Sequence, residues 1–232
     1  MSLNYIVKYL QVFNTLITII LNLSPIFVFI PVLKGRQKYT NIPFLMLIFN
    51  LLNCICWSCY WYRVSYMFPF FCNSVCYAIS SAFFFIYLFF FAKKIVQKFC
   101  LYIFIVILVE TIIVNISIYV IKLKIFGIIL IVINVFMFIA PGQNIIRVCK
   151  EKNYKLIPIA TTLVAIVCSG GWLLFGISVN DINCIIPNII GLICSIFTTI
   201  IWIYYYFRAK IMKNKNKLYS EENINNNNVE IK

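Results

Sequence analysis

Residues 43–73 read PFLMLIFNLLNCICWSCYWYRVSYMFPFFCN, and residues 158–188 read PIATTLVAIVCSGGWLLFGISVNDINCIIPN. Both stretches begin with proline, carry tryptophan fourteen residues later and end on asparagine sixteen residues after that. The recurring landmarks, each displaced by 115 positions, are Pro43, Trp57, Asn73 and Pro158, Trp172, Asn188. One shared proline would mean little, but three ordered residues at two preserved spacings indicate an internal repeat.

The repeat extends towards the N-terminus, because Pro25 and Pro141 are displaced by 116 positions and each precedes a basic segment. Around these landmarks the chain divides into apolar runs near the length of about 20 residues that a helix needs to cross a bilayer. The seven runs are approximately 5–33, 41–62, 68–92, 99–121, 125–148, 156–179 and 183–207. The displacement carries the first three runs onto the last three and leaves the fourth unmatched.

The unmatched fourth run sets the relative orientation of the two units. Four spans separate equivalent helices, and an even number returns the chain to the same side, so the units are parallel and related by an axis along the membrane normal. We therefore predict an all-α integral membrane protein with seven transmembrane helices in a 3+1+3 arrangement. The predicted segments are a first three-helix repeat (1–97), a linker helix (98–122), a second repeat (123–208) and a disordered polar tail (209–232).

The composition supports a membrane protein. Of the 232 residues, 63% are hydrophobic, and the mean hydropathy of +0.97 is far above that of water-soluble domains. The chain has no histidine, and its ten cysteines occur singly and mostly within apolar runs, which favours packing over metal binding. We expect no metal, no cofactor and no catalytic residues.

The basic residues give the orientation. The net charge of +14 could indicate a nucleic-acid partner, but the cations cluster between apolar runs and in the tail, which indicates the membrane surface instead. Sixteen of the twenty Lys and Arg residues fall on one side of the predicted spans, and only Lys8, Arg63, Lys122 and Lys124 fall on the other. Because basic loops stay in the cytoplasm, we predict an external N-terminus and a cytoplasmic C-terminus.

Polar side chains follow one face of several predicted helices, as with Asn50, Asn53 and Trp57 at steps of three and four. For a single asparagine, a hydrogen bond between helices is the simpler interpretation. Equivalent residues of the two units, however, would converge across the pseudo-two-fold axis and form a pocket. An indole covers the apolar face of a pyranose and an amide bonds its hydroxyls, so we predict a sugar site. Its residues would be Trp57, Trp172, Asn73 and Asn188.

Two sets of residues are candidates for gates. A proline removes a helical hydrogen bond and loosens the helix, so prolines near the cytoplasmic helix ends are candidate hinges of an inner gate. These are Pro25, Pro43, Pro141 and Pro158. At the opposite end, Tyr60 and Asp181 lie where an outer gate would close.

These residues resemble the SWEET sugar-transporter family over roughly residues 8–208. The second half is the more similar, with GWLLFG at 171–176, Asp181 and PNIIG at 187–191. The resemblance implies a bidirectional facilitator that works by alternating access, with the four prolines as gate residues and the Trp and Asn pairs around the sugar. The departures are Trp61 where the family has glycine after Tyr60, Cys76 in place of a glycine after Asn73, and Phe175, in the outer gate, where the family has tyrosine before Gly176.

Other functions remain open from the sequence. A proton-coupled amino-acid carrier of the PQ-loop type would display Pro-Gln pairs, whereas Pro141 precedes glycine and Pro25 precedes isoleucine. A seven-helix sorting receptor would need basic residues within its spans, and a scaffold would need no aligned polar stripe. Glu110, in the linker helix, could take part in proton coupling, but we favour a structural carboxyl group there.

We expect a small neutral sugar as the substrate, a mono- or disaccharide with a glucose-like hexose as the first candidate, and the lipid bilayer as the surroundings. The plasma membrane is the expected location, with an intracellular membrane as the alternative. The resemblance implies homo-oligomers, and no nucleic-acid partner is expected.

Overall fold

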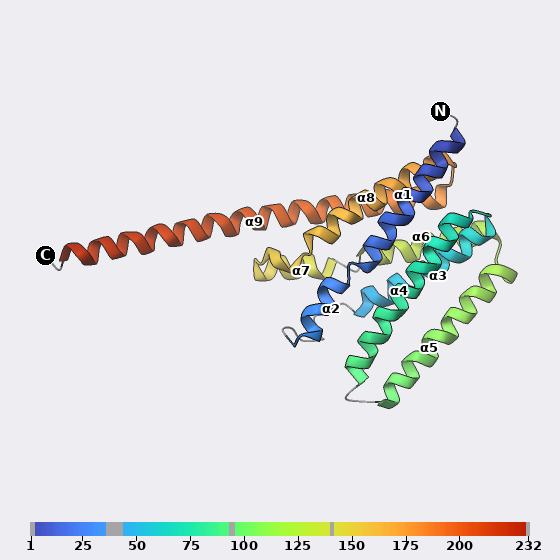
Figure 1. The fold of residues 1–232 in the computed structure, drawn as a ribbon, viewed down its shortest axis with the longest axis horizontal. Coiled ribbons are helices and arrows are strands. Elements are labelled where there is room, and N and C mark those ends of the chain that lie inside the picture. Colours follow the sequence, from blue (N-terminus) through green and yellow to red (C-terminus); the bar gives the residue numbers. More distant parts are fainter. Residues whose placement is uncertain (1–2, 36–43, 93–95, 140–141, 231–232) are drawn as a thin grey trace.

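The computed structural model describes the backbone of residues 3–35, 44–92, 96–139 and 142–230, and this part of the chain is helical apart from short turns (Figure 1). Side chains are described for residues 5–35, 44, 46–90, 101–138 and 145–215. The elements are α1 (Leu3–Leu23), α2 (Ile26–Leu33), α3 (Phe44–Arg63), α4 (Met67–Ala92), α5 (Val96–Asn115), the π-helix η2 (Ile116–Val120), α6 (Leu123–Ile139), α7 (Gly142–Glu151), the 3₁₀ turn η3 (Tyr154–Leu156), α8 (Ile159–Ser178) and α9 (Ile182–Glu230). The predicted all-α class is confirmed over these residues.

Five segments of the described chain are long and apolar enough to cross a membrane. They are Tyr5–Leu33, Met67–Phe90, Leu101–Val120, Ile159–Ser178 and Ile182–Lys215. The segment Leu123–Phe138 is also apolar but shorter. The predicted runs 41–62 and 125–148 are only partly described, so the count of seven spans stays a prediction.

One of the predicted runs is interrupted at a proline. Run 5–33 forms α1 and α2, with Pro25 between them as the residue that precedes α2. Proline has no N–H to donate, and its ring opposes the carbonyl group four residues earlier, so the α-helix is interrupted there. Run 125–148 is described as α6 and α7, and residues 140–141 between them lie outside the described residues.

The backbone repeats with the same displacement as the sequence. α3 and α8 begin and end 115 positions apart, and so do the starts of α4 and α9. Each connecting turn has one residue in the left-handed region, Ser65 with φ 62° and Asn180 with φ 53°. In both turns three backbone hydrogen bonds join equivalent atoms and satisfy carbonyl groups at the helix end. The two turns are therefore the same local structure built from different side chains.

The first helix of each repeat packs against the other repeat. α1 lies against α8, as Figure 1 shows, and α6 lies against α3. α1 and α8 approach closely at Gly171, where an added Cβ would lie 2.1 Å from Asn14 Oδ1. The Nδ2 of the fully buried Asn14 donates to the Gly171 carbonyl oxygen at 2.9 Å. α5 packs against α3 and α4, at the edge of the bundle in Figure 1.

The last helix is longer than predicted. The sequence predicts a disordered tail over 209–232, whereas α9 continues without a break to Glu230 and extends away from the bundle in Figure 1. A membrane span supplies the costly helix nucleus, and each following residue then adds one hydrogen bond to an existing helix. This propagation explains how a polar, charged segment can remain helical without a core of its own.

Candidate functional site: a polar cavity between the two repeats

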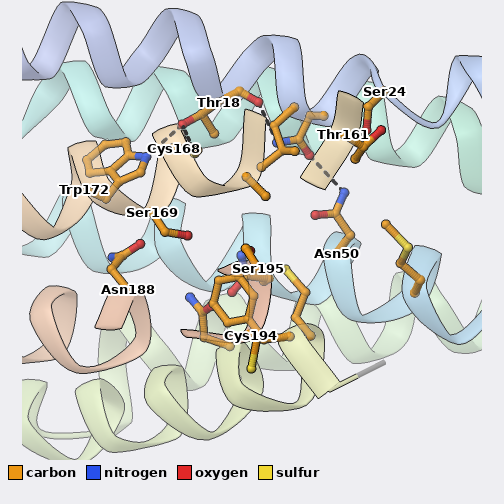
Figure 2. A pocket seen from close by; sticks show the side chains of 18 of the residues that line it. Thr18, Ser24, Asn50, Thr161, Cys168, Ser169, Trp172, Asn188, Cys194 and Ser195 are labelled. Carbon is orange, nitrogen blue, oxygen red and sulfur yellow. Dashed lines mark hydrogen bonds between the residues drawn. The ribbon is translucent and has the colours of Figure 1, made fainter. Parts of the chain in front are cut away.

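A cavity of about 240 Å³ lies between the repeats and receives side chains from α1, α3, α4, α6, α8 and α9 (Figure 2). Met46 and Trp61, both lining residues, are fifteen positions apart on α3, so the cavity extends roughly 20 Å along that helix. We call its two ends the aromatic end, at Trp57, Trp61 and Trp172, and the proline end, at Pro25 and Pro158. Among the described residues, the linker helix α5 contributes nothing to the lining.

Most of the lining comes from pairs of positions that the repeat relates. Between α3 and α8, and between α4 and α9, the displacement is 115, and between α1 and α6 it is 116. The pairs in which both members line the cavity are Thr18 and Asn134, Leu21 and Met137, Asn22 and Phe138, Met46 and Thr161, Asn50 and Ala165, Asn53 and Cys168, Cys54 and Ser169, Trp57 and Trp172, and Asn73 and Asn188. The cavity therefore has approximate two-fold symmetry in its backbone positions.

The four residues predicted to bind sugar all line this cavity. Asn73 donates through Nδ2 to the Pro69 carbonyl oxygen at 2.9 Å, and Asn188 donates in the same way to the Cys184 carbonyl oxygen at 2.7 Å. Because an amide has two N–H groups and an acceptor oxygen, each asparagine is oriented by its own helix and keeps bonding capacity for a ligand. Contact with a substrate stays a prediction for all four residues.

The two predicted tryptophans are held at the aromatic end. Both Trp57 and Trp172 are buried. Trp172 donates from Nε1 to Thr18 Oγ1 at 2.8 Å, and the same hydroxyl lies 3.4 Å from Cys168 Sγ (Figure 2). The hydrogen bond joins α8 of the second repeat to α1 of the first and fixes the plane of the indole.

Two asparagines of the first repeat add amide groups to one wall. Asn50 donates from Nδ2 to Asn22 Oδ1 at 2.9 Å and to Ser80 Oγ at 2.7 Å. Asn22 in turn donates to the Thr18 carbonyl oxygen at 3.0 Å. This network joins α1, α3 and α4, so the polar stripe predicted on α3 faces inward as expected from the cost of polar groups in lipid.

Two further amides have unused acceptors. Asn53 and Asn134 line the cavity, and the Oδ1 atom of each is buried without a hydrogen-bond partner. An unpaired buried acceptor costs about 1–3 kcal/mol, so these oxygens are poised to accept from a ligand hydroxyl or a water molecule. Asn134 was not predicted as a site residue, although it lies 116 positions after Thr18 and the repeat relates the two positions.

The predicted outer-gate residues lie at the aromatic end, where Tyr60 contacts Trp57 and Phe175 contacts Trp172. The Tyr60 hydroxyl donates to the Asp181 carboxylate, at 3.0 and 2.9 Å from its two oxygens, and accepts from Asn183 Nδ2 at 3.0 Å. At the equivalent positions of the other half, Phe175 contacts Tyr66 edge-on with ring centroids 5.7 Å apart. The equivalent pairs of the two halves are therefore joined by a hydrogen bond in one case and by an aromatic contact in the other.

At the opposite end, two of the four predicted hinge prolines are described. Pro25 lies at the break between α1 and α2, and Pro158 immediately precedes α8. Both line the cavity, together with the hydroxyl groups of Ser24, Thr161 and Thr162. Pro43 and Pro141 lie outside the described residues.

The cavity lining carries no charged side chain among the described residues. Glu110 lies away from it, on α5, where it accepts a hydrogen bond from Tyr77 of α4. Its second carboxyl oxygen has no partner. No group of three or more His, Cys, Asp or Glu suited to a metal ion occurs within the part of the chain that the structure describes.

Comparison with known proteins agrees with this architecture. A family model described as "Sugar efflux transporter for intercellular exchange" matches residues 124–210, which extend from α6 into α9. The solved structure of a eukaryotic SWEET transporter is similar with a TM-score of 0.76, covers 89% of this chain and 99% of its own chain, and is 18% identical in sequence. The structural likeness establishes the fold, and the family model confirms the sequence resemblance in the second half. Both matches are to transporters rather than enzymes, and the chain is a multi-pass membrane protein.

Proposed function

We propose that this chain is a SWEET-type transporter that moves a small neutral sugar across a membrane as a bidirectional uniporter. The observation that carries the proposal is the lining of the cavity between the repeats. It presents six carboxamide groups, several hydroxyl groups and stacked indoles, with no charged group among the described residues. The carboxamides belong to Asn22, Asn50, Asn53, Asn73, Asn134 and Asn188.

This lining matches the chemistry of a sugar. A carboxamide both donates and accepts, so it can bond a hydroxyl group in either sense, and an indole face covers the C–H surface of a pyranose ring. A charged amino acid or peptide would need a compensating charge, which the described lining does not offer. We favour a glucose-like hexose as the substrate.

The two ends of the cavity support transport by alternating access. In the conformation described here, the Tyr60–Asp181 hydrogen bond joins α3 to the start of α9 and closes the aromatic end. Opening that end requires the two repeats to separate there, while the proline end closes. We propose that Pro25, Pro43, Pro141 and Pro158 act as the hinges, since a helix bends most readily where a hydrogen bond is missing.

The distribution of basic residues assigns the two ends. By the positive-inside rule, the N-terminus and the aromatic end face the exterior, and the proline end and α9 beyond the membrane face the cytosol. We propose the plasma membrane as the location and a homo-oligomer as the assembled form, as the family resemblance implies. Surface biotinylation and cross-linking in intact membranes test these two points.

The test of the function is uptake into proteoliposomes of radiolabelled glucose, fructose and sucrose, at two pH values and without an imposed ion gradient. Uptake of a sugar that is independent of pH and is lost in Asn188→Ala supports a facilitator that uses this cavity. Uptake that needs a proton gradient would instead favour a proton-coupled carrier, with Glu110 as the first residue to replace. Failure to transport any sugar would overturn the proposal.

A further inference from the structure

Trp61 marks the largest difference in side-chain volume between equivalent positions at the aromatic end. Its counterpart 115 positions later is Gly176. A Cβ added there would lie 3.1 Å from Ile185 Cγ1 and 3.2 Å from Cys184 Cβ, so α8 packs tightly on α9 and little space is left for a side chain. The first repeat instead places an indole at this position, and its helix α3 directs the indole into the cavity lining.

The Trp61 ring occupies the space between the two predicted sugar-stacking residues. It lies 5.2 Å from the Trp57 ring at an interplanar angle of 21°, and 6.0 Å from the Trp172 ring at 20°. Tyr66 and Phe175 contact it edge-on at 5.9 and 5.8 Å. Only 1% of Trp61 is exposed, so the packing of its neighbours holds the ring in place.

Three nearly parallel indoles therefore form a continuous ceiling across both repeats. A sugar ring cannot enter between Trp57 and Trp172 while Trp61 fills that space, and must lie on the proline side of the ceiling. The remaining cavity of about 240 Å³ falls below the ~300 Å³ at which pockets for drug-sized ligands begin. There is room for a small ligand, and the ceiling prevents a longer one from extending towards the aromatic end.

We propose that Trp61 sets the upper size limit of the substrate, so that the protein transports monosaccharides and excludes disaccharides. The inference rests on the proposed sugar transport and adds the residue that selects among sugars. A smaller side chain at position 61 would extend the cavity past Trp57 towards Tyr66 and Phe175. The second ring of a disaccharide would occupy that space.

The experiment compares sucrose and glucose uptake by wild type, Trp61→Ala and Trp61→Leu in proteoliposomes, normalised to the amount of reconstituted protein. We expect wild type to favour glucose by at least tenfold, and Trp61→Ala to raise the sucrose-to-glucose ratio by about tenfold. Trp61→Leu should give a smaller rise. The matched control is Trp202→Ala, which removes an indole that contacts Tyr154 and Tyr206 outside the cavity lining and should leave the ratio unchanged.

The sucrose-to-glucose uptake ratio distinguishes size selection from a looser closure, because loosening the aromatic end would change the uptake of both sugars together. A measurement on the wild type alone covers the case in which the variants do not fold. Methyl glucoside should compete with labelled glucose, and sucrose should compete at least tenfold more weakly. Two results would overturn the role of Trp61 while leaving the proposed sugar transport intact. One is glucose uptake with which sucrose competes as well as methyl glucoside does. The other is an unchanged sucrose-to-glucose uptake ratio in folded Trp61→Ala. Absence of uptake of every sugar by wild type would overturn the proposed function.

Discussion

The two halves of the cavity use equivalent backbone positions but present different chemistry. Asn22 and Asn50 of the first repeat correspond to Phe138 and Ala165 of the second, and all four line the cavity. Among the pairs in which both members are described and line the cavity, only Trp57 with Trp172 and Asn73 with Asn188 are identical. The Trp and Asn pairs are symmetric, whereas the walls that carry Asn22 and Asn50 on one side and Phe138 and Ala165 on the other are not. Such a cavity would hold an asymmetric molecule such as a hexose in one preferred orientation.

The largest effect should come from the symmetric pair. We expect Asn73→Ala and Asn188→Ala each to lower sugar uptake by roughly 100-fold or more, because a site built to bond hydroxyl groups loses most when one of its polar partners is removed. Both should leave membrane abundance unchanged, since each side chain bonds only within its own helix. Uptake assays paired with immunoblots measure the two quantities.

The same pair tests whether the symmetry is functional. If Asn188→Ala abolishes uptake and Asn73→Ala does not, the site belongs to the second half and the repeat is only structural. Normal uptake by both variants would remove these asparagines from the site.

The closure at the aromatic end offers the next contrast, between the Tyr60–Asp181 hydrogen bond and the Phe175–Tyr66 ring contact. A hydrogen bond to a charged group is worth about 1.5–3 kcal/mol, so Tyr60→Phe should favour opening at this end. Because apparent affinity depends on the populated fraction of the open state, the KM for external sugar should fall by up to about tenfold. Initial uptake rates in intact cells, measured over a range of sugar concentrations, give this value.

The control for Tyr60→Phe is Phe175→Tyr at the equivalent position. The new hydroxyl group would meet Tyr66 rather than a carboxylate, so its effect on KM should be small. Equal effects of both substitutions would mean that the hydrogen bond does not hold the closure.

The repeat explains which parts of the site could be predicted from the sequence. Identical residues at a fixed displacement identified Trp57, Trp172, Asn73 and Asn188, and the structure brings all four to one cavity. Trp61 and Asn134 differ from their counterparts, so a search for identities marked the first only as a departure from a family and missed the second. A comparison of this kind finds what the halves share, whereas the cavity is also shaped by how they differ.

Helix boundaries could be predicted less well, for physical reasons. Hydropathy alone does not register a proline within an apolar run, so run 5–33 counts as one span, and only the separate argument from Pro25 predicts a weak point where α1 ends. Composition likewise predicted disorder after residue 208, because it does not take account of helix propagation from a preceding span. Both differences arise from backbone hydrogen bonding rather than from side-chain polarity.

The contacts that hold the repeats together also differ between the halves. α1 approaches α8 at Gly171, whereas the equivalent position on α3 is Cys56, which carries a side chain. Gly171→Ala should push against the buried Asn14 and lower the free energy of unfolding by about 1–3 kcal/mol. The adjacent Gly170 has nothing within 4 Å of an added Cβ, so Gly170→Ala should be neutral or stabilising through helix propensity. Thermal unfolding in detergent compares the two variants, and equal stability would mean that α1 and α8 are not closely packed.

The smallest expected effect concerns the walls of the cavity. Asn50→Ala makes the first-repeat wall resemble that of the second, where Ala165 is the counterpart, and removes the bonds to Asn22 and Ser80. Losing a neutral hydrogen bond costs about 0.5–1.5 kcal/mol, so we expect the KM for glucose to rise a few-fold with little change in the maximal rate.

The mirror variant Ala165→Asn adds an amide opposite the original one. If asymmetry orients the sugar, Ala165→Asn will not restore the KM when combined with Asn50→Ala. Restoration of the KM would show that only the number of amide groups matters for sugar binding, and not which repeat carries them.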